Sequence, residues 1–160
     1  MNNPSSLLRF VLSIILAMCL RIAPWQEPLT AYNPDWILLT VIYWSLASPE
    51  RRGIFTGLTV GILTDILTGR MLGLHALTYS LAAFFSLKLH KRLRQYPLPQ
   101  QGLFIMLCLF CSQFLTFWLE NLHAPLRFQA SFWLPVLTGT VCWPLVYSFL
   151  RVVRLHNRSR

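Results

Sequence analysis

The chain has 160 residues, of which 55% are hydrophobic and only 12% are charged, and its mean hydropathy is +0.52. A soluble domain carries about a quarter charged residues, whereas a membrane-spanning helix needs about 20 mostly apolar residues. Six such helices would use most of the chain and leave short loops and ends. The composition therefore indicates an integral membrane protein. It excludes a separate soluble domain, a disordered chain, a nucleic-acid-binding fold and a secreted disulfide scaffold.

Apolar segments predict an all-α fold with six transmembrane helices in a single membrane domain covering residues 1–160. The first segment is interpreted as a retained helix and not a cleaved signal peptide, because Arg21 interrupts its end and further apolar segments follow. The predicted spans are residues 7–24, 34–48, 53–69, 71–89, 102–119 and 131–150. Several are at or below the usual length, which indicates shielding by neighbouring helices or locally thin lipid.

The second span has a predicted helix start. Asn33 is the expected N-cap, Pro34 suits the first helical position, and Asp35 falls in the first turn. Residues of these types stabilise a helix start. The cap side chain accepts hydrogen bonds from backbone N–H groups that have no partner within the helix, and the helix dipole favours a negative charge in the first turn.

The net charge of +9 is distributed unevenly along the predicted topology. With six spans, one face of the membrane receives Arg9, Arg51, Arg52, Lys88, Lys91, Arg92, Arg94, Arg151, Arg154, Arg158 and Arg160. The opposite face receives only Arg21, Arg70 and Arg127. Cytoplasmic loops of membrane proteins are enriched in Lys and Arg. The pattern therefore predicts a multi-pass protein with both termini in the cytoplasm.

The third span carries small residues and one acid at regular spacing. Gly57, Gly61, Asp65 and Gly69 recur every four residues, and Gly73 continues the spacing. Such a stripe lets another helix approach closely, so these five positions are predicted to bind a partner or to pack against another helix. Asp65 is expected to hydrogen-bond within the chain, near His75 or Arg70, because a single acid makes no proton relay across a bilayer.

A second polar stripe lies on the fifth span. Gln113, Thr116 and Glu120 share one helix face, with Phe117 beside them. Hydrogen bonding between helices is the preferred interpretation.

Motifs for catalysis or metal binding are not found. There is no nucleophile elbow, no His-Glu-x-x-His zinc motif and no P-loop. The Cys108-x-x-Cys111 pair lies inside an apolar span, and no second pair completes it. We therefore predict a protein that is not an enzyme and has no metal and no cofactor.

These residues together resemble the MreD family, the rod shape-determining membrane proteins of bacteria. The most specific segment is Gly57-Leu-Thr-Val-Gly61-Ile-Leu-Thr-Asp65-Ile-Leu-Thr-Gly69-Arg-Met-Leu-Gly73. Supporting segments are Pro34-Asp35-Trp36, Tyr43-Trp44-Ser-Leu-Ala47-Ser-Pro49, Phe117-Trp118-Leu-Glu120 and Trp143-Pro144. Each motif is weak alone, but their order and the chain length agree over nearly the whole sequence.

The resemblance implies a location in the bacterial cytoplasmic (inner) membrane and a role in cell elongation. Implied partners are the single-span protein MreC, the actin-like MreB, the transglycosylase RodA with its penicillin-binding transpeptidase, and membrane lipid; nucleic acid is not among them. It also implies a fold similar to the substrate-binding component of energy-coupling-factor transporters. The alternative function is accordingly a small-molecule-binding transporter subunit, with Asp65, Gln113 and Glu120 as polar contacts.

Overall fold

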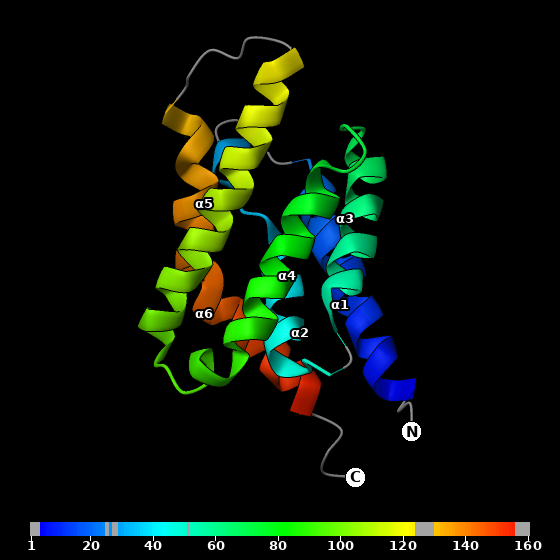
Figure 1. Ribbon diagram of the computed structural model, residues 1–160, viewed down its shortest axis with the longest axis vertical. Helices are drawn as coiled ribbons and strands as arrows, with labels where there is room; N and C mark the ends of the chain where they lie inside the picture. The colour runs from blue at the N-terminus through cyan, green and yellow to red at the C-terminus, as the bar shows by residue number, and fades with distance from the viewer. Residues whose placement is uncertain (1–3, 25, 27–28, 51, 124–129, 156–160) are drawn as a thin grey trace.

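The computed structural model describes residues 4–24, 26, 29–50, 52–123 and 130–155. Within these residues the protein is all-helical, with six α-helices, two short 3-10 helices and no β-strand. The elements are α1 (Pro4–Ile22), η1 (Leu29–Tyr32), α2 (Trp36–Ala47), α3 (Ile54–Thr68), α4 (Leu74–Leu93), α5 (Leu98–His123), η2 (Ala130–Trp133) and α6 (Leu134–Leu155). Figure 1 shows them as a bundle of roughly parallel and antiparallel helices.

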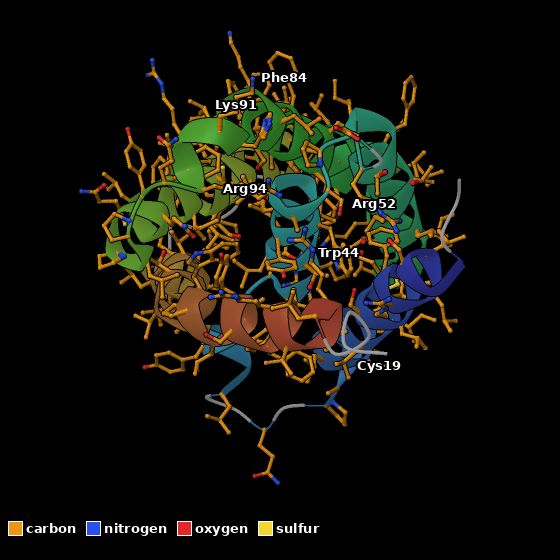
Figure 2. All side chains as sticks on the ribbon, turned by 90° about the horizontal axis from the view of Figure 1, so that it is seen from below. Cys19, Trp44, Arg52, Phe84, Lys91 and Arg94 are labelled. Carbon is orange, nitrogen blue, oxygen red and sulfur yellow. The ribbon has the colours of Figure 1, made fainter. Side chains whose placement is uncertain are left out.

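Helix α2 forms the centre of the bundle. Every residue from Ile37 to Ala47 is buried, and Figure 2 shows α2 surrounded by the other five helices. A helix that is apolar on all sides is stable only when it is covered all round. The indole of Trp44 anchors α2 to α1, because its Nε1 donates to Ser13 Oγ over 2.8 Å and its ring meets Phe10 edge-on.

The outer helices have the opposite distribution of apolar residues. Many large apolar side chains on α1, α3, α4, α5 and α6 point away from the core, among them Leu12, Phe55, Leu81, Leu107 and Leu145. Soluble proteins rarely expose apolar patches of this extent. The exposed surface is therefore suited to a lipid environment.

Two helices in the described part of the chain are long and apolar enough to cross a membrane by themselves, namely α5 and α6. Helices α2 and α3 are apolar but shorter, with 12 and 15 residues. Because a helix rises 1.5 Å per residue, α2 is about 18 Å long, against about 30 Å for a hydrocarbon core. Six full spans thus remain a prediction.

Several helix boundaries differ from the predicted ones. Helix α2 begins at Trp36, and its N-cap is Asp35, whose Oδ1 accepts the Leu38 N–H over 3.1 Å. The prediction of Asn33 as the cap was wrong, because the Asn33 side chain instead accepts a 2.7 Å hydrogen bond from Trp36 Nε1. Helix α4 starts at Leu74 and not at residue 71, since a turn through Gly73 precedes it.

Helices α5 and α6 also differ from their predicted ranges. Helix α5 extends beyond residues 102–119 at both ends, and α6 begins after η2 and continues to Leu155. Helix α6 passes through Pro144 without a break in the helix.

The start of α1 and the end of α6 lie at the same end of the bundle. Arg9 Nη1 donates to the carbonyl of Arg154 over 2.6 Å, and Arg52 Nη2 donates to the carbonyl of Ser6 over 3.1 Å. At the same end, Arg94 Nη2 donates to the carbonyl of Ala47, the last residue of α2, over 2.7 Å. Arg9 and Arg94 thus satisfy carbonyl groups that the C-terminal ends of α6 and α2 leave without a partner.

Candidate functional site

The Asp65 carboxylate joins α3 to the start of α4. Its Oδ2 accepts the Gly73 N–H over 2.8 Å and the Ala76 N–H over 3.4 Å, while its Oδ1 accepts the His75 N–H over 3.0 Å. The N-cap of α4 is Gly73, which has no side chain to do this. Asp65 of α3 therefore caps the N-terminus of α4 in place of an N-cap side chain, and its negative charge suits that position.

His75 completes the contacts of this carboxylate. Its Nδ1 lies 2.7 Å from Asp65 Oδ1, and both side chains are buried, Asp65 completely. Because a carboxylate only accepts, Nδ1 must carry the proton and donate it. The structure thus brings together Asp65 and His75, one of the two partners expected from the sequence.

The glycines of the third span bring the α3 and α4 backbones into contact. A Cβ atom on Gly61 would overlap the backbone of His75 and Ala76, and one on Gly57 would come within 2.6 Å of the Tyr79 carbonyl oxygen. Both glycines are therefore covered by α4 of the same chain.

The other two glycines of the stripe have a different role. Gly69 and Gly73 have positive φ angles of 63° and 104° and form the turn between α3 and α4. A Cβ atom on either would meet nothing within 4 Å, so only their backbone conformation requires glycine.

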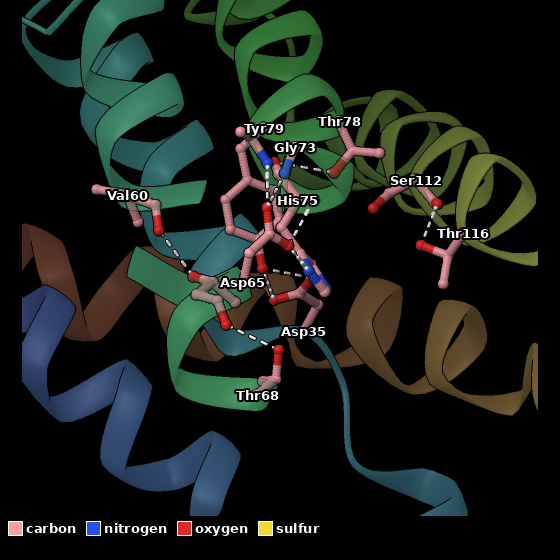
Figure 3. Close-up of polar contacts among 12 residues, drawn as sticks. Asp35, Val60, Asp65, Thr68, Gly73, His75, Thr78, Tyr79, Ser112 and Thr116 are labelled. Atoms are coloured by element: carbon pink, nitrogen blue, oxygen red, sulfur yellow. Dashed lines mark hydrogen bonds and ion pairs between the residues drawn. The ribbon is translucent and has the colours of Figure 1, made fainter. Parts of the chain in front are cut away.

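A second acid, the half-buried Asp35, lies beside these residues, as Figure 3 shows. The Tyr79 hydroxyl lies 2.9 Å from both carboxylate oxygens of Asp35, and the Tyr79 ring meets the His75 ring edge-on at 5.5 Å. Asp65, His75, Tyr79 and Asp35 form one continuous group, which we call the polar cluster. It connects α3, α4 and the start of α2.

The polar cluster borders a cleft of about 560 Å³ at the end of the bundle opposite the start of α1. Residues in or next to all six α-helices line it. Its polar lining residues are Arg21, Asn33, Asp35, Thr68, Arg70, His75, Ser112, Gln113 and Thr116. Apolar side chains, including Leu67, Leu109 and Val136, complete the wall.

The second predicted stripe contributes two of these lining residues. Gln113 Nε2 donates to the Phe132 carbonyl over 2.9 Å and so links α5 to η2. Thr116 Oγ1 donates to the Ser112 carbonyl over 3.0 Å within α5. The side chain of Glu120 lies outside the described residues. Asp65 does not line the cleft, whereas its hydrogen-bond partner His75 does.

Sequence reasoning missed most of the polar cluster. Asp35 was assigned only to a helix start, and Tyr79 was not considered. Asp35 and Tyr79 are 44 residues apart in the sequence. A local sequence pattern cannot predict a contact between residues so far apart. The one available signal was Tyr79 itself, because a polar group within an apolar span needs a partner.

The contacts within the cluster are hydrogen bonds and one ring contact. Across the part of the chain that the structure describes, no three His, Cys, Asp or Glu side chains come together to hold a metal. Both carboxylates are held by helix N–H groups and by one ring or hydroxyl donor. Such bonds fix the positions of α2, α3 and α4 relative to one another.

Comparison with known proteins gives two matches. The family model described as "rod shape-determining protein MreD" matches residues 4–153. The rod shape-determining protein MreD of Haemophilus influenzae is 32% identical over 142 residues, which cover 88% of this chain and 86% of that protein. No solved structure matches the chain. The family match covers nearly the whole chain, including the polar cluster, so the chain belongs to the MreD family of rod shape-determining proteins.

Proposed function

We propose that this protein is a non-catalytic membrane subunit of the bacterial cell-elongation machinery. In this role it binds MreC and helps couple peptidoglycan synthesis to the cytoplasmic MreB filament, with RodA and its penicillin-binding transpeptidase as direct or indirect partners. The family match over residues 4–153 carries the assignment to rod shape determination. The hydrogen bonds that Asp35 and Asp65 accept from neighbouring groups support a structural role for these two acids.

The same proposal places the chain in the inner membrane with several passes and both ends in the cytoplasm. The apolar outer surface supports the membrane location. The arginine contacts at the end where α1 begins and α6 ends support the orientation, because Lys and Arg mark the cytoplasmic side. Exposed Lys91 and Arg92 at this end suit anionic lipid or a filament.

A surface for MreC must lie elsewhere than on Gly57 and Gly61, since α4 already covers both. An apolar groove of about 970 Å³ lies between α4, α5 and α6. Its lining residues include Leu93, Leu103, Leu107, Phe110 and Leu137. The groove borders the two helices most able to cross a membrane, and its lining is mostly apolar, so an apolar membrane segment fits it. The single span of MreC is such a segment.

Copurification with MreC tests the proposal. Leu107 and Leu137 are both groove residues and are 59% and 58% exposed. The double variant Leu107→Ala, Leu137→Ala should retain much less MreC in mild detergent and should round the cells, because it removes apolar contacts from the groove. The matched control is Leu12→Ala, Leu63→Ala, whose leucines are each 54% exposed on α1 and α3.

Equal recovery of MreC with both double variants would place the contact outside the groove. Absence of MreC with the unaltered chain would overturn the proposal itself. Recovery of an ATP-binding-cassette pair would instead favour the alternative function, a small-molecule-binding transporter subunit, for which the polar cleft is the supporting observation. The likeness to an energy-coupling-factor component stays a prediction.

A further inference from the structure

The cleft between the helix ends carries positive charge next to apolar walls. Arg21, from the last turn of α1, and Arg70, from the turn after α3, both line it. Asp35 is the one acid in the described lining, and its carboxylate is held by the Tyr79 hydroxyl and the Leu38 N–H. Two guanidinium groups in a concave, partly apolar space are suited to bind an anion.

His75 supplies an independent sign of a ligand. The residue is only 3% exposed, and it lines the cleft. Asp65 holds its Nδ1, so Nε2 is the ring nitrogen for which the described residues provide no hydrogen-bond partner. Because His75 lines the cleft, this nitrogen is available to a ligand bound there. Nε2 can accept from a phosphate hydroxyl or, when the ring is protonated, donate to a phosphate oxygen.

We propose that this cleft binds the phosphate group of a small organic ligand between Arg21, Arg70 and His75, with the organic part against Leu67, Leu109 and Val136. Phosphate is preferred because it offers oxygens in several directions, and the three cationic or imidazole groups come from three different elements. The phosphate belongs either to a soluble phosphate ester or to a phospholipid headgroup that enters from the adjoining membrane leaflet.

Two binding measurements on the full chain separate these sources. Isothermal titration calorimetry in an uncharged detergent and phosphate-free buffer uses inorganic phosphate and glycerol 3-phosphate as probes. Native mass spectrometry after delipidation uses added phosphatidylglycerol. Saturable binding of a soluble probe assigns a soluble ester, and retention of the lipid alone assigns a headgroup.

The variant Arg21→Gln, Arg70→Gln tests the site. Each arginine removed should weaken binding about tenfold or more, because hydrogen bonds to charged groups are worth about 1.5–3 kcal/mol. The control Lys88→Gln, Arg151→Gln removes the same charge from exposed positions on α4 and α6 and should bind like the unaltered chain.

The two outcomes that overturn the proposal are clear. Either no probe binds with a saturable signal, or binding falls equally in the two double variants. Neither measurement uses MreC or cell shape, so failure here leaves the proposed function unaffected.

Discussion

At the scale of single residues, the buried acid in α3 illustrates how a charge is tolerated inside an apolar bundle. Asp65 receives four hydrogen bonds, three from backbone N–H groups at the start of α4 and one from the His75 ring. The N–H groups at a helix start have no partners within the helix. An acid from the adjacent helix therefore satisfies donors that hydrocarbon would leave without water.

Replacing this acid by its amide tests the capping role. Asp65→Asn keeps the shape but turns an NH₂ group towards backbone donors, so at least one buried donor loses its acceptor. We expect a loss of about 1–3 kcal/mol in stability, measured as a lower thermal unfolding midpoint in detergent. Glu50→Gln is the control, because Glu50 is exposed. Normal stability with loss of rod shape would contradict a purely structural role and indicate an essential charge.

The contact between Tyr79 and Asp35 makes a second prediction at this scale. Tyr79→Phe removes the hydroxyl that contacts both oxygens of Asp35. A lost hydrogen bond to a charged group should lower stability by about 1.5–3 kcal/mol, again visible in the thermal midpoint. Tyr96→Phe, at an exposed position, should change nothing. Equal midpoints for the two variants would show that the hydroxyl contributes little.

At the scale of elements, the pair α3 and α4 depends on close backbone contact. The two helices touch where Gly57 and Gly61 face Tyr79 and Ala76. Glycine costs stability within a helix relative to alanine. Here close packing offsets that cost, because any side chain would separate the helices.

Gly61→Ala should therefore destabilise the protein. The added methyl group overlaps the α4 backbone, which cannot move as a flexible side chain can. Overpacking of this kind typically costs about 1–3 kcal/mol, and unfolding in a graded denaturing detergent would measure it. Gly53→Ala is the control, because Gly53 is the N-cap of the same helix and a Cβ atom there meets nothing within 4 Å. A stable Gly61→Ala variant would mean that the helices can separate without cost.

At the scale of the whole molecule, the bundle has two different ends. One carries the arginine contacts around Arg9, Arg52 and Arg94. The other carries the polar cleft. In the proposed orientation the arginine end faces the cytoplasm and the cleft opens to the outside.

Labelling with a membrane-impermeant maleimide tests this orientation. Leu72→Cys lies in the turn between α3 and α4 and is 73% exposed, whereas Gln95→Cys is exposed just after α4. In intact spheroplasts only Leu72→Cys should be labelled above the level of the unaltered chain, and Gln95→Cys only after the membrane is opened. The reverse pattern would invert the topology.

The sequence by itself determined the helical class, the approximate positions of six helices and the family. Apolar runs and glycine spacing are local properties, so they can be read without coordinates. Boundaries were less accurate: Asp35 replaced Asn33 as the N-cap of α2, because only the folded chain shows that Trp36 occupies the Asn33 oxygen.

Only the tertiary structure decided what the polar residues contact. In the folded chain, Gly57 and Gly61 pack against α4, and Asp65 caps the N-terminus of that helix. The Asp35 carboxylate accepts a hydrogen bond from the Tyr79 hydroxyl. The tertiary structure also placed Arg21, Arg70 and His75 around one cleft. These relations link residues from different helices, and their energies depend on how the helices pack. A one-dimensional pattern records which residues share a face, but the packing determines what that face meets.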